Sequence, residues 1–403
     1  METLRIAANA LRAHKMRSFL TLLGVIIGVM TVVTVVAIIS GLNNYIQEKV
    51  FQLNPDVYAV TQFGIITSRE QWLEAIKRKK IDWNDYQAVR ERCTRCELVG
   101  AHFNNRTTVK RGAQKLNGVR AAGVTSNMAE IQNLDLETGR FFTPTEEQRS
   151  ALVAVIGSDV RDELFGRLDP IGRVINIAGQ PMRVIGLLSK QGSVLGQNQD
   201  KVLYIPISTW QKRFGSRESL DVFVRATGGV AGVDASMDDV RVILRGRRRT
   251  GFRADDPFAT VTAEALQMLW KSISAGLFSL MVLISGISLL VGGIVIMNIM
   301  LVSVVERTRE IGVRRAIGAT RKNIRRQFLM EAVLLSLGGG ILGVLLGIGI
   351  AKAISTFSPM PTLVRPTLVA AGLLISVVTG MVAGVIPAVR ASRLPPVEAL
   401  RYE

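Results

Sequence analysis

Four long stretches without any charged residue constrain what this chain can fold into. They run over residues 18–47, 272–305, 332–351 and 366–389 of the 403-residue sequence. Each reaches the roughly 20 apolar residues that a helix needs to cross a hydrocarbon core of about 30 Å. The sequence therefore predicts a membrane protein rather than a soluble enzyme. We place its four transmembrane helices at 18–41, 272–305, 328–356 and 367–389.

A long polar interval separates the first apolar stretch from the second. Residues 42–271 carry most of the charge and are long enough to bury a hydrophobic core of their own. Within this interval, residues 174–177 and 182–185 flank a Gly-Gln-Pro turn, a pattern that predicts a β-hairpin. The expected fold is a four-helix membrane protein with a large α+β domain between helices 1 and 2.

The basic residues predict how the chain is oriented. The net charge is +18, and Lys and Arg are dense before the first stretch, between the second and third, and after the fourth. Because cytoplasmic segments of membrane proteins are enriched in Lys and Arg, we expect both termini inside and the 42–271 domain outside. The same layout predicts a cytoplasmic interfacial helix (1–17), a cytoplasmic link (306–327), an outer loop (357–366) and a cytoplasmic tail (390–403). The positive charge thus indicates topology and not nucleic-acid binding.

The first two apolar stretches allow alternatives. The first exceeds the roughly 7–15 residues of a signal-peptide core, which favours an uncleaved span. The second would extend about 50 Å as a single helix, longer than the hydrocarbon core. Its excess length fits either a stalk that reaches the outer domain or a few interfacial turns.

Glycines in the apolar stretches predict close helix packing. Small residues spaced by four let membrane helices approach closely and gain dispersion contacts. The candidates are Gly24, Gly28, Gly292, Gly293, Gly339, Gly343, Gly347, Gly380 and Gly384. They predict a bundle or a dimer without identifying which helices meet.

The spans contain no deeply placed ionisable residue, so an ion-coupled carrier is not indicated. We expect the energy that drives this protein to be transmitted through a short amphipathic helix in the cytoplasmic link. This helix breaks near Gly318. This helix is either a docking site for a cytoplasmic motor protein or a basic anchor on anionic lipid. The candidate interface residues are Glu306, Arg307, Thr308, Arg309, Glu310, Ile311, Gly312, Arg314, Arg315, Ala316, Gly318 and Ala319.

Other polar clusters point less clearly to a function. Cys93 and Cys96 are the only cysteines, and a disulfide between them is chemically plausible outside the membrane. Only His102 lies near them, so we expect no metal site. Four arginines between 245 and 249 are expected to form a solvated loop or to contact anionic lipid.

Two groups of motifs carry a family likeness. The strongest are 289–303, 306–312 with 318–319, 327–332 and the tail 387–401. Weaker ones follow one another at 139–142, 155–157, 164–166, 169–172 and 184–186. In kind and order these motifs resemble the MacB/FtsX-type ABC transporter permeases of the mechanotransmission, or type VII, class. The likeness covers nearly the whole chain and is weakest over 58–120.

The resemblance implies a permease without catalytic residues of its own, which works with a separate cytoplasmic ABC ATPase. No Gly-Lys dipeptide, and hence no phosphate-binding P-loop, occurs in these 403 residues. ATP and magnesium are therefore expected on the partner, and no cofactor on this chain. The resemblance also implies a homodimer, an optional periplasmic adaptor and outer-membrane channel, and a bacterial inner-membrane location. It divides the outer domain into a porter-like lobe (50–119 and 220–262) and an inserted lobe (120–217).

Three functions remain open from the sequence. The first is export of a hydrophobic or peptide-like substrate. The second is an FtsX-like signalling scaffold that activates a cell-wall hydrolase. The third is lipoprotein release, as in the LolC and LolE relatives. The large outer domain favours export.

Overall fold

The computed structural model describes residues 15–45, 54–194, 197–215, 218–358, 360–396 and 399. The chain divides into two compact units, which we call the helical unit (Met1–Ile46 with Ser272–Glu403) and the sheet domain (Gln47–Lys271). The sheet domain corresponds to the expected outer domain. Most of the interfacial helix predicted at 1–17 lies outside the described residues.

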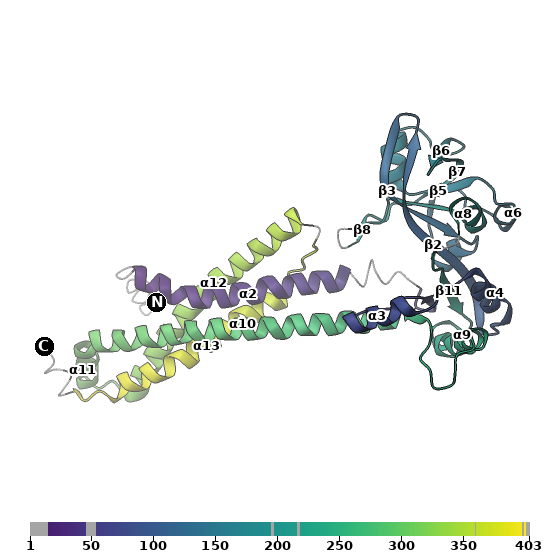
Figure 1. Cartoon of the computed structure of the whole chain (residues 1–403). Coiled ribbons are helices and arrows are strands. Elements are labelled where there is room, and N and C mark those ends of the chain that lie inside the picture. Colours follow the sequence, from purple (N-terminus) through teal and green to yellow (C-terminus); the bar gives the residue numbers. More distant parts are fainter. Residues whose placement is uncertain are drawn as a thin grey trace. The chain divides into compact units, whose positions relative to one another are not determined.

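In the described part of the helical unit, a short helix joins two of four long ones (Figure 1). They are α2 (Lys15–Tyr45), α10 (Ala263–Glu306), α11 (Thr308–Ala316), α12 (Arg321–Phe357) and α13 (Pro366–Arg393). All but α11 are long and apolar enough to cross a membrane. Helix α10 is the longest, with 44 residues, and begins at Ala263 rather than at the predicted Ser272.

Valines of α2 pack into a row of glycines on α12. Val25, Val29 and Val33 are fully buried and recur every four residues, so they form one ridge along α2. The facing groove on α12 is made by Gly339, Gly343 and Gly347. A Cβ at Gly343 would lie 2.9 Å from the carbonyl oxygen of Ile26, and one at Gly347 would lie 2.9 Å from Val33. These glycines therefore set the distance between the two helices within one chain.

The other predicted packing glycines lie at further helix crossings. A Cβ at Gly24 would meet the Cα of Gly292 at 2.6 Å, so α2 and α10 touch through their backbones. Gly28 faces Leu289, Gly380 faces Ser336, and Gly384 faces Ala332. Gly293 differs, because a Cβ there would meet Thr379 at an ordinary 3.6 Å.

One mixed sheet forms the framework of the sheet domain, with strand order β12-β1-β11-β2-β3-β10-β5-β7-β4 and β6 paired with β2 and β7. Its strands are β1 (Val57–Thr61), β2 (Cys96–Arg111), β3 (Gln114–Val124), β4 (Leu136–Gly139), β5 (Val153–Ile156), β6 (Val174–Ile177), β7 (Gln180–Leu188), β10 (Val202–Pro206), β11 (Asp221–Ala226) and β12 (Ala259–Thr262). Strands β8 (Ser193–Val194) and β9 (Gln197–Asn198) pair separately. The predicted hairpin is present as β6 and β7.

Short helices complete the sheet domain. They are α3 (Arg69–Lys77), α4 (Trp83–Arg92), α5 (Met128–Ile131), α6 (Pro144–Gln148), α7 (Ser158–Phe165), α8 (Ile207–Phe214) and α9 (Val233–Arg247), with a 3-10 turn η2 (Gly229–Gly232). Helices α4 and α9 pack against each other and against β2 and β11 (Figure 1). The lobe boundary that we placed at 119/120 falls inside β3, which pairs with both β2 and β10. The two expected lobes therefore share one sheet.

Candidate functional site

Helix α11 occupies the segment predicted to dock a partner. It runs from Thr308 to Ala316, and the φ angle of +108° at Gly318 turns the chain toward α12. Gly318 can adopt this left-handed conformation without a Cβ clash. The break predicted near Gly318 is therefore present. The segment 306–327, which the sequence assigns to the coupling helix, also contains the first turns of α12, because α12 begins at Arg321 with Thr320 as its N-cap.

One face of α11 is buried in the helical unit. Ile311 is 3% exposed, and Gly312 is also buried. A Cβ at Gly312 would lie 2.6 Å from the Cβ of Ala399, so only glycine allows this approach of the C-terminal segment. The Thr308 hydroxyl donates to the carbonyl oxygens of the last turn of α10, which fixes the start of α11.

Arg307 ties the end of α10 to α12. Its guanidinium donates to the Glu331 carboxylate at 3.0 and 3.3 Å, and both side chains are largely buried. The sequence places Glu331 at the entrance of the third span but does not identify Arg307 as its partner.

Arg314 and Arg315 also make contacts within the chain. Arg314 donates to Gln327 at 2.7 Å and to Glu310 at 2.5 Å. Arg315 donates to the carbonyl oxygens of Ser392 at 3.3 Å and Leu394 at 2.7 Å, at the end of α13. Both were predicted to contact an ATPase, but their guanidinium groups bind neighbouring segments of the same unit.

The opposite face of α11 is exposed. Arg309, Val313 and Ile317 follow one another at helical spacing, with Glu310 and Ala316 beside them. Val313 is 41% and Ile317 82% exposed. We call these five residues the exposed α11 strip. It combines three apolar side chains with two charged ones, on a helix whose other face is packed in the helical unit.

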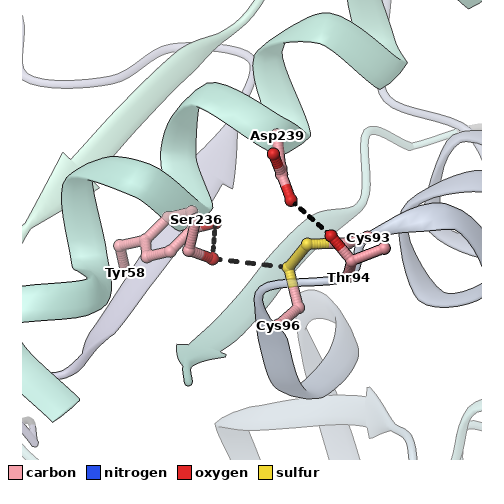
Figure 2. Close-up of a disulfide and its surroundings, with 6 residues drawn as sticks. All are labelled: Tyr58, Cys93, Thr94, Cys96, Ser236 and Asp239. Atoms are coloured by element: carbon pink, nitrogen blue, oxygen red, sulfur yellow. Dashed lines mark hydrogen bonds between the residues drawn. A yellow bond between two sulfur atoms is a disulfide. The ribbon is translucent and has the colours of Figure 1, made fainter. Parts of the chain in front are cut away.

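Cys93 and Cys96 form a disulfide between the end of α4 and the start of β2. Figure 2 shows that this disulfide faces α9. Ser236 lies 3.4 Å from the Cys96 sulfur and 2.8 Å from the Tyr58 hydroxyl, and Thr94 donates to Asp239 at 3.0 Å. Because a disulfide sulfur carries no proton, Ser236 donates to it and Tyr58 donates to Ser236. Burial raises the pKa of Tyr58, so its proton is retained.

The disulfide therefore holds the α4–β2 turn against α9. Cys93 closes the C-terminal end of α4, where the helix dipole disfavours a thiolate. These contacts indicate a structural staple rather than a catalytic thiol pair. Within the described ranges no group of three or more His, Cys, Asp or Glu side chains could hold a metal.

The arginine run 245–249 was predicted to form a solvated loop or to contact anionic lipid. The prediction of a solvated loop is wrong for Arg248, whereas Arg249 is exposed. Arg248 is only 4% exposed at its side chain and donates at 2.7 Å to Asp85, which is 2% exposed. Arg247 donates to the other oxygen of the same carboxylate at 2.8 Å, and Arg245 pairs with Asp256 at 2.6 Å. This cluster joins the end of α9 to the capping box of α4.

Comparisons with known proteins give two family-model matches along this chain. A family model described as the MacB-like periplasmic core domain matches residues 18–243, and one described as the FtsX-like permease C-terminal matches residues 282–396. YknZ of Bacillus subtilis, named as an ABC transporter permease, is 32% identical over all of this chain and 99% of its own length. MacB of Bdellovibrio bacteriovorus, named as a macrolide export ATP-binding/permease protein, is 35% identical over all of this chain but only 62% of its own.

Two solved structures match about half of this chain. The periplasmic region of MacB from Actinobacillus actinomycetemcomitans is 16% identical, covers 56% of this chain and 97% of its own, and has a TM-score of 0.46. The extracellular domain of YknZ from Gram-positive bacteria is 18% identical, covers 51% of this chain and 100% of its own, and has a TM-score of 0.41. Together the two family models and the YknZ match show that this chain belongs to the MacB/FtsX-type ABC transporter permeases.

Proposed function

We propose that this permease couples ATP hydrolysis by a separate cytoplasmic ABC ATPase to motion of its outer domain, and that this motion drives export of a hydrophobic or peptide-like substrate. The observation that carries the proposal is the exposed α11 strip. Its residues face away from the bundle, while Ile311, Gly312 and Arg315 hold the other face of the helix in place. A partner that pushes on the strip therefore pushes on α10, α12 and α13 together.

The proposed orientation puts α11 and both chain ends in the cytoplasm of a bacterial cell, with four helices crossing the inner membrane. The basic residues near the ends of α10, α12 and α13 support it. Labelling of single cysteines introduced in intact cells should find Gln199 outside and Lys322 inside.

The length of α10 supports transfer of motion across the membrane. Its 44 residues correspond to about 66 Å of continuous helix, more than twice the hydrocarbon thickness. Arg307 and Glu331 connect its end to α12 beside α11. ATP and magnesium would be bound by the partner. We further expect a homodimer of permeases, with an adaptor and an outer-membrane channel where the cell envelope has them.

The test compares aspartate substitutions on the strip with one elsewhere. Val313→Asp and Ile317→Asp should each weaken co-purification of the cognate ATPase at least tenfold, because a charge replaces an exposed apolar contact without disturbing the bundle. Val242→Asp is the matched control, since Val242 is 72% exposed on α9 in the sheet domain. All three variants should reach the membrane at wild-type levels.

A lipid-anchor role for α11 predicts a different pattern. Binding of the ATPase would then survive Val313→Asp and the double variant Arg309→Glu with Glu310→Arg. Contact of α11 with anionic lipid would instead decline with total positive charge, and Glu310 would matter little. Normal ATPase binding in the strip variants would refute the proposed interface.

A further inference from the structure

The sheet domain contains an apolar cavity that the coupling mechanism does not use. Its volume is about 410 Å³, within the range of small-molecule sites. Strands β1, β11 and β12 form its floor, and the first two turns of α10 form one wall. Its apolar lining includes Val57, Ala59, Phe63, Phe223, Val261 and Leu266.

The cavity follows from side-chain size on one face of the sheet. On the opposite face, Tyr58 and Val60 of β1 and Val222 and Val224 of β11 are fully buried in the main core. On the cavity face, Ala59 lies opposite both Phe223 and Val261 in the strand register. A small residue between two larger ones leaves a hollow over the centre of the three strands.

One carboxylate, that of Asp221, lines this cavity. In the described part of the chain it has no hydrogen-bond or ion-pair partner. His102 is its register partner on β2, but the Nδ1 atom of His102 is itself buried without a partner among the described residues. Burial, and then the charge of Arg120, lower the pKa of His102 to about 4, so this imidazole is neutral and supplies no compensating charge.

An uncompensated carboxylate in apolar surroundings is unfavourable for folding. Burial raises the pKa of Asp221 to about 6, which still leaves the group mainly ionised at neutral pH. Such a group is stabilised by a cation that enters the cavity, because attraction between charges is stronger in partly buried surroundings than in bulk water. An anion would be repelled, and a neutral polar ligand would leave the charge unpaired.

We propose that this cavity binds a small organic cation, a protonated amine carried on an apolar body. The ammonium group would pair with Asp221, and the body would lie against Phe223 and Leu266. Phe63, which is 42% exposed, and Phe223 offer aromatic faces to the same cation. Because Ala263 and Leu266 belong to the first two turns of α10, the bound ligand would touch the helix that continues into the helical unit.

The experiment uses the full-length protein in lipid nanodiscs, with empty nanodiscs to measure partitioning into lipid. Phenethylamine is the charged probe and phenethyl alcohol its neutral counterpart, both read by saturation-transfer NMR and calorimetry. Wild-type protein should bind the amine at least tenfold more tightly than the alcohol. Asp221→Asn should abolish this preference, because it removes the negative charge and keeps the side-chain shape.

Two further variants separate the site from general effects. Asp255→Asn removes an exposed carboxylate of the same domain and should leave amine binding unchanged. Leu266→Trp should fill the cavity and remove binding of both probes. Asp221→Asn should also raise the unfolding temperature of the ligand-free protein. Equal binding of amine and alcohol, an unchanged affinity in Asp221→Asn, or no binding of either probe would each overturn the proposal. None of these measurements involves the ATPase, so they are independent of the proposed coupling function.

Discussion

In the helical unit, α12 approaches α2 because Gly343 and Gly347 have no side chain to keep the backbones apart. In the sheet domain, α9 is held to α4 because Arg248 and Arg247 share the carboxylate of Asp85. The contact between α12 and α2 depends on glycines that have no side chain, and the contact between α9 and α4 depends on paired charges. Membrane helices gain no hydrophobic driving force from association, so they rely on close van der Waals contact. A water-soluble fold can bury charge where each partner is satisfied.

This comparison teaches where each unit is vulnerable. The helical unit should respond to added volume and hardly to changes in charge. The sheet domain should respond to a lost carboxylate and tolerate added volume at its open positions. Each of the following predictions tests one side of this contrast.

Asp85→Ala should have the largest effect. It leaves Arg248, which is 4% exposed, without its anion, and loss of one member of a buried ion pair typically costs about 3–5 kcal/mol. Thermal unfolding of the sheet domain, followed by circular dichroism on the detergent-solubilised protein, should show the loss. Asp238→Ala is the control, because its pair with Arg241 is exposed.

A compensating double variant sharpens this test. Replacing both partners, as in Asp85→Leu with Arg248→Met, should recover much of the lost stability because no charge is then left unpaired. If Asp85→Ala alone changes nothing, the arginine cluster does not hold α9 to α4.

Gly343→Ala should destabilise the helical unit by about 1–3 kcal/mol, because the new methyl group would meet the backbone of α2. Gly349→Ala, on the same helix, is the matched control, since a Cβ at Gly349 has no neighbour within 4 Å. Unfolding in increasing concentrations of dodecyl sulfate measures the difference. Equal stability of the two variants would mean that α12 does not depend on glycine to reach α2.

Cys96→Ser should cost about 2 kcal/mol at most, because the disulfide closes a loop of only four residues and excludes few unfolded conformations. A reductant should lower the unfolding temperature of the wild-type protein by the same amount and leave Cys96→Ser unchanged. A much larger loss of stability would show that the contacts of this turn with Ser236 and Asp239 contribute more to the free energy of unfolding than closure of the short loop does.

Mild acid should give the smallest effect and confine it to the sheet domain. Burial alone raises the pKa of Asp85, but hydrogen bonds from Arg248, the Asp82 amide and Arg247 outweigh it and lower the pKa overall. Chiefly the hydrogen bond from Arg140 lowers the pKa of Glu146 to about 2. A carboxylate with a lowered folded-state pKa stabilises the fold above its unfolded-state pKa, and this contribution is lost as the pH falls toward the folded value.

Between pH 7 and pH 5 two opposing contributions act on the unfolding temperature of the sheet domain: His102, with its lowered pKa, loses stability below about pH 6.5, and Asp221, with its raised pKa, gains stability below about pH 6. The two carboxyls with lowered pKa add a decline below about pH 4.5, the ordinary value for Glu146. Differential scanning fluorimetry across this range measures the change. Glu146→Gln should decline less steeply. A decline that begins near neutrality would point to groups other than these two carboxyls.

Local patterns predict local structure well in this protein. The glycine spacing indicates close packing, and the turn at Gly179 indicates the β6–β7 hairpin. Which helix meets Gly343 is not a local property, since its partner Ile26 lies more than 300 residues earlier in the chain.

The errors have the same origin. The sequence predicts a solvated Arg248 because its partner, Asp85, is 163 residues away in the chain. The lobe boundary near Arg120 divides a strand whose pairing with β10 is visible only in the folded domain. The inward orientation of Arg315 in α11 is likewise not visible in the sequence, because its partners Ser392 and Leu394 lie at the far end of the chain. That α11 binds an ATPase stays a prediction.

The contact between Arg315 and the end of α13 makes the two segments one cooperative element. The last carbonyl groups of a helix have no partner within it, and here the guanidinium of Arg315 supplies one for Ser392 and Leu394. A shift of α11 would remove this partner from the final turn of α13. Amide hydrogen exchange in that turn should then be faster, and it would report whether the proposed docking of an ATPase moves α11 without any label on the partner.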